Sequence, residues 1–284
     1  MKIVKAFLAT LLAIIIGISL FIITPLSELA LSIMYNNTGN NIFYWLIDIV
    51  DPNRLYLAVY PLTIAIYAII YFAWINRHKL KADTVWDTKT GIISSIIIGI
   101  AFGAISTLWV KFLMNTPLSD IDFIKKSLEY LKFGANNSSG LSFFITLIVA
   151  GFLAPVSEEL MFRGAVFRIL EKNVNKLYAL IFSSLLFGLV HMSFVQSVYA
   201  SIMGLISGIV YIKTGKLRWS MLIHITINTV ATVAPVSNPA WVIFTVLMLI
   251  PFGVIFYRFF KSEKQENQSY ENVSNDNIPV QEFM

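Results

Sequence analysis

The sequence predicts an all-α polytopic membrane protein with about eight transmembrane helices and with both termini in the cytoplasm. Of its 284 residues, 57% are hydrophobic and 13% are charged, whereas soluble domains average about 45–50% apolar and about 25% charged residues. Apolar runs of about 20 residues recur along the chain, and a helix of that length crosses the hydrocarbon core of a bilayer. Basic residues gather between alternate runs. These observations exclude a water-soluble globular fold.

The predicted spans are apolar runs bounded by charged residues or by Asn, Pro and Gly. They are Ile3 to Ile23, Leu55 to Ile75, Gly91 to Leu113, Leu141 to Arg168, Leu177 to His191, Ser197 to Ile212, Trp219 to Val233 and Trp241 to Tyr257. The first run follows two lysines, as a signal peptide would, but it exceeds the roughly 7–15 apolar residues of such peptides. No small-x-small cleavage site precedes Pro25, where we expect the run to break. We therefore interpret it as a retained anchor.

The basic residues predict the orientation. With a cytoplasmic N-terminus, sixteen Lys and Arg residues fall in cytoplasmic segments and five on the opposite face. The positive-inside rule then places both termini in the cytoplasm. The net charge of +5 suits basic loops that face anionic lipid, and no basic stripe with interleaved aromatic residues indicates a nucleic-acid partner. The absence of cysteine excludes disulfides, thiolate zinc sites and a cysteine nucleophile.

Residues 1–260 form one predicted transmembrane domain, and residues 261–284 form a predicted disordered cytoplasmic tail. The tail is rich in Glu, Asn, Gln and Ser, so it has too little apolar surface to offset the entropy of ordering. In the loop around residues 115–140, Ile121, Ile124, Leu128 and Leu131 recur at helical spacing between charged residues. This pattern predicts an amphipathic helix at the membrane interface.

Polar groups at membrane depth are costly and mark candidate functional sites. Glu158 and Glu159 follow a mostly apolar run, and Arg163 comes four residues after Glu159. Residues four apart share a helix face, so Glu159 and Arg163 can form an ion pair. Glu158 points about 100° away from Glu159 and stays available for chemistry.

Two further spans carry polar groups at comparable depth. His191 ends the fifth span, with Phe187 one turn before it, and His224 and Asn228 share one side of the seventh span. At about 1.5 Å per residue, Glu158 and His191 lie at one level, roughly 20 Å from the cytoplasmic end, with His224 and Asn228 shallower. We expect these groups to line a cavity that opens towards the cytoplasm. Taken singly, each has a structural alternative: an ion-pair cluster, a buried histidine or a hydrogen bond between helices.

Two chemistries fit this set. Glu158 and His191 can activate water for attack on a peptide carbonyl, while His224 and Asn228 donate hydrogen bonds to the resulting oxyanion. Alternatively, Glu158, His191 and His224 can ligate a catalytic zinc ion with an open fourth position. The residues leave this choice open. The chain has no His-Glu-x-x-His, Gly-x-Ser-x-Gly or phosphate-binding loop motif.

Three motifs in order along residues 141–233 carry a family resemblance. They are Glu158-Glu159-x-x-x-Arg163, Phe187-x-x-x-His191 and His224-x-x-x-Asn228. They resemble the signature motifs of the CPBP family, also called the Abi or type II CAAX-protease family, which includes the Ras-converting CAAX endopeptidase. The resemblance implies an eight-helix intramembrane endopeptidase. It also implies that Glu158 and His191 activate water, that His224 and Asn228 serve the oxyanion, and that Glu159 and Arg163 are supporting residues.

The resemblance also implies the partners. The substrate is a membrane-associated peptide or protein, lipidated in the eukaryotic relatives, and both zinc-dependent and metal-free mechanisms are argued for the family. Bacterial members are implicated in bacteriocin self-immunity and peptide processing, so a non-proteolytic peptide-binding or immunity protein is an alternative. A proton-coupled transporter that uses Glu158 and His191 as a relay is a more distant one, because no internal repeat is visible. The Ala-poor, Ile-, Lys- and Asn-rich composition indicates the plasma membrane of a low-GC Gram-positive bacterium.

Overall fold

The computed structural model describes residues 2–47, 53–75, 80, 86–136, 140–233, 239–259 and 261, and all regular structure among them is helical. The principal helices are α1 (Lys2–Gly17), α2 (Leu20–Thr38), α3 (Asn41–Leu46), α4 (Asn53–Ile69), α5 (Thr88–Met114), α6 (Asp122–Asn136), α7 (Leu141–Ile148), α8 (Ala154–Glu159), α9 (Arg168–Glu171), α10 (Lys176–Leu189), α11 (Phe194–Thr214), α12 (Leu217–Val233) and α13 (Pro239–Leu247). The all-α prediction is confirmed for this part of the chain. The predicted disordered tail lies outside the described residues, apart from residue 261.

Six helices in the described part of the chain are long and apolar enough to cross a membrane. They are Ile3–Thr38, Asn53–Ala73, Thr88–Met114, Leu141–Glu171, Phe194–Thr214 and Pro239–Phe259. The predicted fifth and seventh spans correspond to α10, with 14 residues, and α12, with 17. The structure is therefore that of a multi-pass membrane protein, while eight spans and the orientation of the termini stay predictions.

The sequence suggested that the first apolar run breaks at Pro25, but no break occurs there. The chain bends earlier, around Ile18 and Ser19, and α2 continues through Pro25 to Thr38. Pro25 lies near the start of α2, and the proline is accommodated within that helix. A side chain at Gly17, just before the bend, would lie 2.6 Å from Leu186 of α10, so this position brings α1 close to the bundle.

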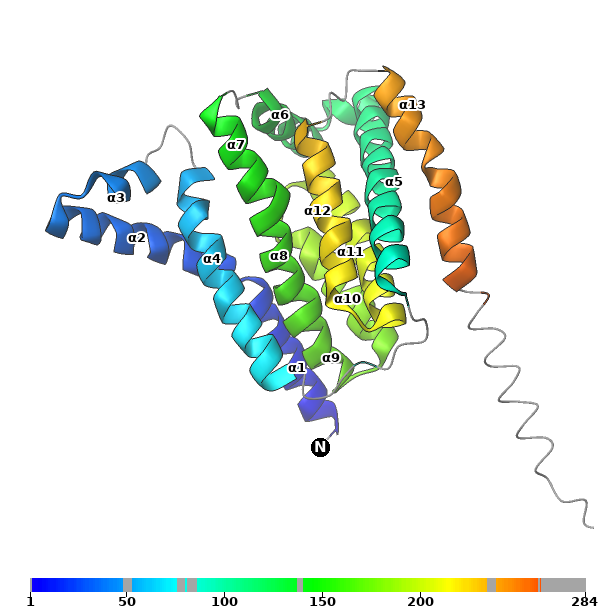
Figure 1. Ribbon diagram of the computed structural model, residues 1–284, viewed down its shortest axis with the longest axis horizontal. Coiled ribbons are helices and arrows are strands. Elements are labelled where there is room, and N and C mark those ends of the chain that lie inside the picture. Colours follow the sequence, from blue (N-terminus) through cyan, green and yellow to red (C-terminus); the bar gives the residue numbers. More distant parts are fainter. Residues whose placement is uncertain are drawn as a thin grey trace, which may run out of the picture.

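The helices form a bundle with two distinct ends, visible in Figure 1. The start of α1 lies at one end, and α6 lies across the other. The predicted amphipathic helix is confirmed as α6, whose Ile124 and Leu128 pack with Leu113 and Val195. Trp86 stacks on Phe259 and contacts Trp219 near the opposite end. The core between the two ends is built around Phe162, Phe167, Phe187, Tyr211 and Ile223.

One long helical column carries the two glutamates. It comprises α7, α8 and α9, and it is interrupted by two π-helical segments, Val149–Leu153 and Leu160–Phe167, on either side of α8. Insertions of this kind inside α-helices frequently accompany functional sites. The sequence predicted a helix over this region without these interruptions.

Candidate active site

Glu159 is the centre of a buried polar network. Its side chain has 0% exposure, and its Oε1 lies 3.2 Å from Nη1 of Arg163. Ser220 of α12 donates a hydrogen bond to the other carboxylate oxygen of Glu159, and Nδ1 of His224 lies 3.3 Å from Oε1. The predicted pair of Glu159 and Arg163 is thus confirmed. Both charges are compensated inside the bundle, which a buried ion pair requires.

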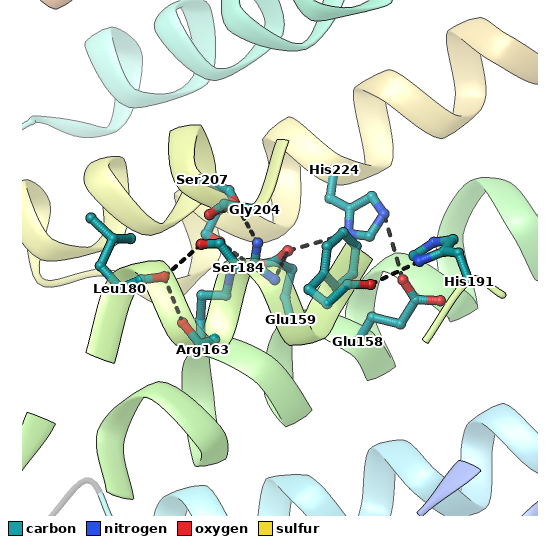
Figure 2. A network of polar contacts seen from close by, with 12 residues as sticks. Glu158, Glu159, Arg163, Leu180, Ser184, His191, Gly204, Ser207 and His224 are labelled. Carbon is teal, nitrogen blue, oxygen red and sulfur yellow. Dashed lines mark hydrogen bonds and ion pairs between the residues drawn. The ribbon is translucent and has the colours of Figure 1, made fainter. Parts of the chain in front are cut away.

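Arg163 extends the network to two more helices. Its Nη2 donates to Oγ of Ser207 at 2.7 Å, and its guanidinium lies 4.7 Å from the ring centroid of Phe187. A cation over an aromatic face gains attraction from the ring quadrupole, more so away from water. Arg163 therefore ties the helical column to α11 and α10, and Figure 2 shows this network beside Glu158.

Glu158 points away from this network, as its position on the helix predicts. It retains 16% exposure and lines a cavity, and its Oε2 lies 3.8 Å from Nε2 of His224. His224 has only 3% exposure and so stands between the two glutamates, one at each ring nitrogen. The two adjacent carboxylates thus occupy different environments, one buried and paired, the other facing open space.

His191 faces the same cavity from the end of α10. Its Nδ1 donates a hydrogen bond to the backbone carbonyl of Phe187 at 2.8 Å. Because a carbonyl only accepts, Nδ1 carries the proton, and in the neutral ring Nε2 is the basic nitrogen. Figure 2 shows the His191, Glu158 and His224 side chains converging. The ring of Phe187 contacts both imidazoles, at centroid distances of 5.0 and 5.6 Å.

Asn228 lines the cavity one turn beyond His224, and its Nδ2 donates to the backbone carbonyl of Ala150 at 2.9 Å. The helix itself leaves that carbonyl without a partner. In the π-helical segment the N–H of Ala154 bonds to Val149, five residues back, so the next donor in register would be Pro155, which has no N–H. Asn228 therefore supplies the missing hydrogen bond and joins α12 to the column.

The cavity has a volume of about 650 Å³ and brings together all four predicted catalytic residues, Glu158, His191, His224 and Asn228. This volume is typical of sites for small ligands and peptide segments. The far part of the lining comes from Met114, Leu131 and Trp241, at the end of the bundle where α6 lies. The cavity thus extends from the catalytic groups towards the α6 end, and its expected opening towards the cytoplasm stays a prediction. A depth estimate measures the level of a residue along a helix, and the packing on either side determines access.

A second cavity of about 330 Å³ reaches the same groups from the side. It is lined by α1 and α2 and shares Tyr56, Tyr60, Glu158 and His191 with the first cavity. Helix α4 is tied to the column next to Glu158, where Thr63 and the buried Ser157 share a hydrogen bond of 2.7 Å. Glu158 thus lies where the two cavities meet.

The residues do not form the alternative zinc site. Among the described residues, no group of three or more His, Asp and Glu side chains is placed so that it could hold a metal ion. His191 uses only Nδ1 for a backbone carbonyl, which leaves Nε2 directed at the cavity, and His224 has a carboxylate at each nitrogen. Glu158, His191 and His224 therefore converge on the cavity, but they are not grouped closely enough to form a metal site as they stand.

Several residues at the site carried no signal in the sequence. Ser207 and Ser220 partner Arg163 and Glu159, and Tyr56 and Tyr60 line both cavities. Serine and tyrosine are common in apolar helices, and nothing in their spacing connects them to a distant glutamate. The four-residue step from Ser220 to His224 places both on one helix face, and this was the one available clue.

Comparison with known proteins agrees with this geometry. Residues 140–230 match the sequence model of the family described as Type II CAAX prenyl endopeptidase Rce1-like. The "Putative membrane peptidase YdiL" of Bacillus subtilis (strain 168) is 28% identical over 127 residues, covering 40% of this chain and 52% of that protein. The chain thus matches about half the length of that relative, and no solved structure matches it. Residues 140–230, which hold all three motifs, are thus similar to the Rce1-like type II CAAX prenyl endopeptidase family.

Proposed function

We propose that this protein is a membrane-embedded endopeptidase that hydrolyses a peptide bond of a membrane-associated peptide or protein. The observation that carries the proposal is the division between the two glutamates. Glu159 is buried and paired, whereas Glu158 faces a cavity of about 650 Å³ together with two histidines. A carboxylate and an imidazole beside a cavity are the groups that general acid–base hydrolysis needs.

The proposed reaction begins with a water molecule held between the carboxylate of Glu158 and Nε2 of His191. Glu158 accepts a proton from this water while the water oxygen attacks the peptide carbonyl carbon. The carbonyl oxygen becomes an oxyanion, and the proton then passes to the leaving amine as the carbon–nitrogen bond breaks. The products are a new carboxyl group and a new amino group, and Glu158 returns to its starting state.

His224 and Asn228 are placed to serve the oxyanion. Glu159, kept ionised by Arg163, accepts a hydrogen bond from Nδ1 of His224. With Nδ1 directed at Glu159, a hydrogen on Nε2 of His224 would be donated towards the cavity. Asn228 has a second amide hydrogen beyond the one given to Ala150. Donors fixed before the reaction starts are the most effective kind for stabilising an oxyanion.

The test is cleavage of a library of fluorogenic, membrane-partitioning peptides by the purified protein in detergent. Loss of a general acid–base group lowers a rate by about 100- to 10,000-fold, so Glu158→Gln and His191→Ala should each lose at least about 100-fold. Glu28→Gln is the matched control, because Glu28 lies exposed on α2 outside both cavities. Wild-type cleavage by Glu158→Gln would rule out this mechanism. An inactive wild-type protein that binds the peptides would favour the non-proteolytic alternative.

A further inference from the structure

The catalytic cavity extends from Glu158 towards one end of the bundle only. Helices α5 and α12 contribute lining residues from the level of the catalytic groups towards the end where α6 lies. On α5, for example, the lining starts at Phe102 and ends at Met114, although the helix begins at Thr88. On α12 it starts at His224 and ends at Ala231, although that helix begins at Leu217. The cavity therefore has its floor at the catalytic groups, where the second cavity meets it from the side.

Packed side chains close the other side of that floor. Ser207 has 0% exposure and Arg163 has 2%, and Arg163 lies on the column between Glu158 and α9, the part of the column that contacts α1. Arg163 is held there by its contacts with Glu159, Ser207 and the ring of Phe187. A peptide that came from the α1 end would have to displace this charged network, which is costly inside a bilayer.

The basic residues gather at the closed end. Lys5 and Lys172 line one small cavity there, and the amine of Lys216 donates to the backbone carbonyl of Trp86. Along the sequence, sixteen of the 21 Lys and Arg residues fall in segments predicted to share the face of the N-terminus, and five fall in segments predicted to lie on the opposite face. The positive-inside rule assigns the end richer in Lys and Arg to the cytoplasm.

We infer that the substrate reaches Glu158 from the extracytoplasmic face of the membrane, through the mouth beside α6. This inference rests on the proposed function and names the substrate class: an extended peptide segment presented outside the cytoplasm. The described lining holds no Lys or Arg, and its polar groups are mainly neutral, such as Asn53, Ser106 and Gln196. The segment that enters therefore carries no acidic side chain, since no Lys or Arg in this lining would offset a buried carboxylate.

The chain is well suited to a test of sidedness because it contains no cysteine, so single-cysteine variants have no background. Thr90 and Asn115 are exposed residues at opposite ends of α5, and Thr90→Cys and Asn115→Cys report the two faces. Ser106→Cys reports the cavity, and Thr107→Cys is the second variant if the first does not fold. Leu108→Cys is the matched control, because Leu108 is exposed on the outer surface of the same helix and does not line the cavity.

Intact cells that express each variant are treated with a membrane-impermeant maleimide, which reacts with thiols in contact with water. We expect labelling of Asn115→Cys and Ser106→Cys, and none of Thr90→Cys or Leu108→Cys. After purification, labelled Ser106→Cys should lose cleavage of the fluorogenic peptide library completely relative to its unlabelled form. Leu108→Cys treated in the same way should keep its rate.

Three results would overturn the inference. Labelling of Thr90→Cys in place of Asn115→Cys would mean that the cavity faces the cytoplasm. If the maleimide labels Asn115→Cys but neither Ser106→Cys nor Thr107→Cys, the mouth of the cavity is closed to water. Full cleavage by the labelled cavity variant would mean that the substrate takes another path. Failure of the proposed function is distinguishable, because the unlabelled wild-type protein would then cleave no peptide. The labelling pattern would still show on which face of the membrane the cavity opens.

Discussion

Two consecutive glutamates have opposite environments in this protein. Glu159 contacts Arg163, Ser220 and His224 and has no exposure, whereas Glu158 faces the cavity and lies 3.8 Å from His224. The 100° step between successive helix positions separates them. This arrangement gives one carboxylate a structural task and leaves the other for chemistry.

Ser220 offers a test of the buried network. Ser220→Ala removes a donor to Glu159 and leaves a buried acceptor less satisfied, which costs about 1–3 kcal/mol of stability. The thermal unfolding midpoint should fall, and cleavage should fall with it, because His224 shares the same carboxylate.

Ser95→Ala is the matched control for this prediction. Ser95 also has 0% exposure, but its hydroxyl finds no hydrogen-bond partner among the described residues, so its loss should be neutral or stabilising. Equal midpoints for the Ser220 and Ser95 variants would show that the hydroxyl of Ser220 contributes nothing to the network.

At the scale of single residues, the sequence motifs predicted most of the site. Helical spacing alone predicted the pair of Glu159 and Arg163 and the free direction of Glu158, and both are confirmed. It could not predict that His224 lies between the glutamates, because that contact depends on how α12 packs on the column. The catalytic roles of Glu158, His191, His224 and Asn228 stay predictions.

At the scale of elements, the helical column shows how a proline shapes the site. Pro155 and the π-helical segment before it leave the carbonyl of Ala150 without a backbone donor, and Asn228 takes that place. The proline thus fixes an amide of α12 near the catalytic groups. Helical spacing in the sequence marks Pro155 only as a residue that disfavours a helix. The change to π-helical hydrogen bonding has no sequence pattern by which it could have been predicted.

Pro155→Ala should separate stability from activity. The new N–H can bond to Ala150 and displace Asn228, while the helix gains a hydrogen bond and loses a proline. We expect an unchanged or higher thermal midpoint and a rate of cleavage lower by up to about 100-fold, the size that misplacement of a reacting group can produce.

Asn228→Ala is the comparison for this variant. It removes the same amide but leaves Ala150 unsatisfied, so it should lose activity without any gain in stability. If Pro155→Ala cleaves at the wild-type rate, the position of the Asn228 amide does not depend on the proline.

Other elements show where local patterns suffice. The amphipathic spacing of α6 predicted a helix correctly because it arises from one face that packs on Leu113 and Val195. The predicted break at Pro25 was wrong because a proline near the start of a helix can be accommodated, and the bend lies instead at Ile18 and Ser19.

At the scale of the whole molecule, composition predicted a helical membrane protein, and six long apolar helices agree. Large apolar side chains cover the outside of the bundle, among them Phe72, Phe152 and Leu185, as a lipid environment requires. The direction in which the cavity opens could not be predicted. It follows from which half of each helix is filled by packed side chains, and this emerges only when all the helices are assembled.

The most direct test of the central claim compares Glu158→Gln with Glu159→Gln, measuring cleavage per folded molecule together with the thermal midpoint. We predict that Glu158→Gln keeps the wild-type midpoint and loses cleavage by at least about 100-fold. Glu159→Gln should instead lower the midpoint markedly, because removing one partner of a buried ion pair costs about 3–5 kcal/mol. A Glu158→Gln protein that folds and cleaves like the wild type would contradict the account.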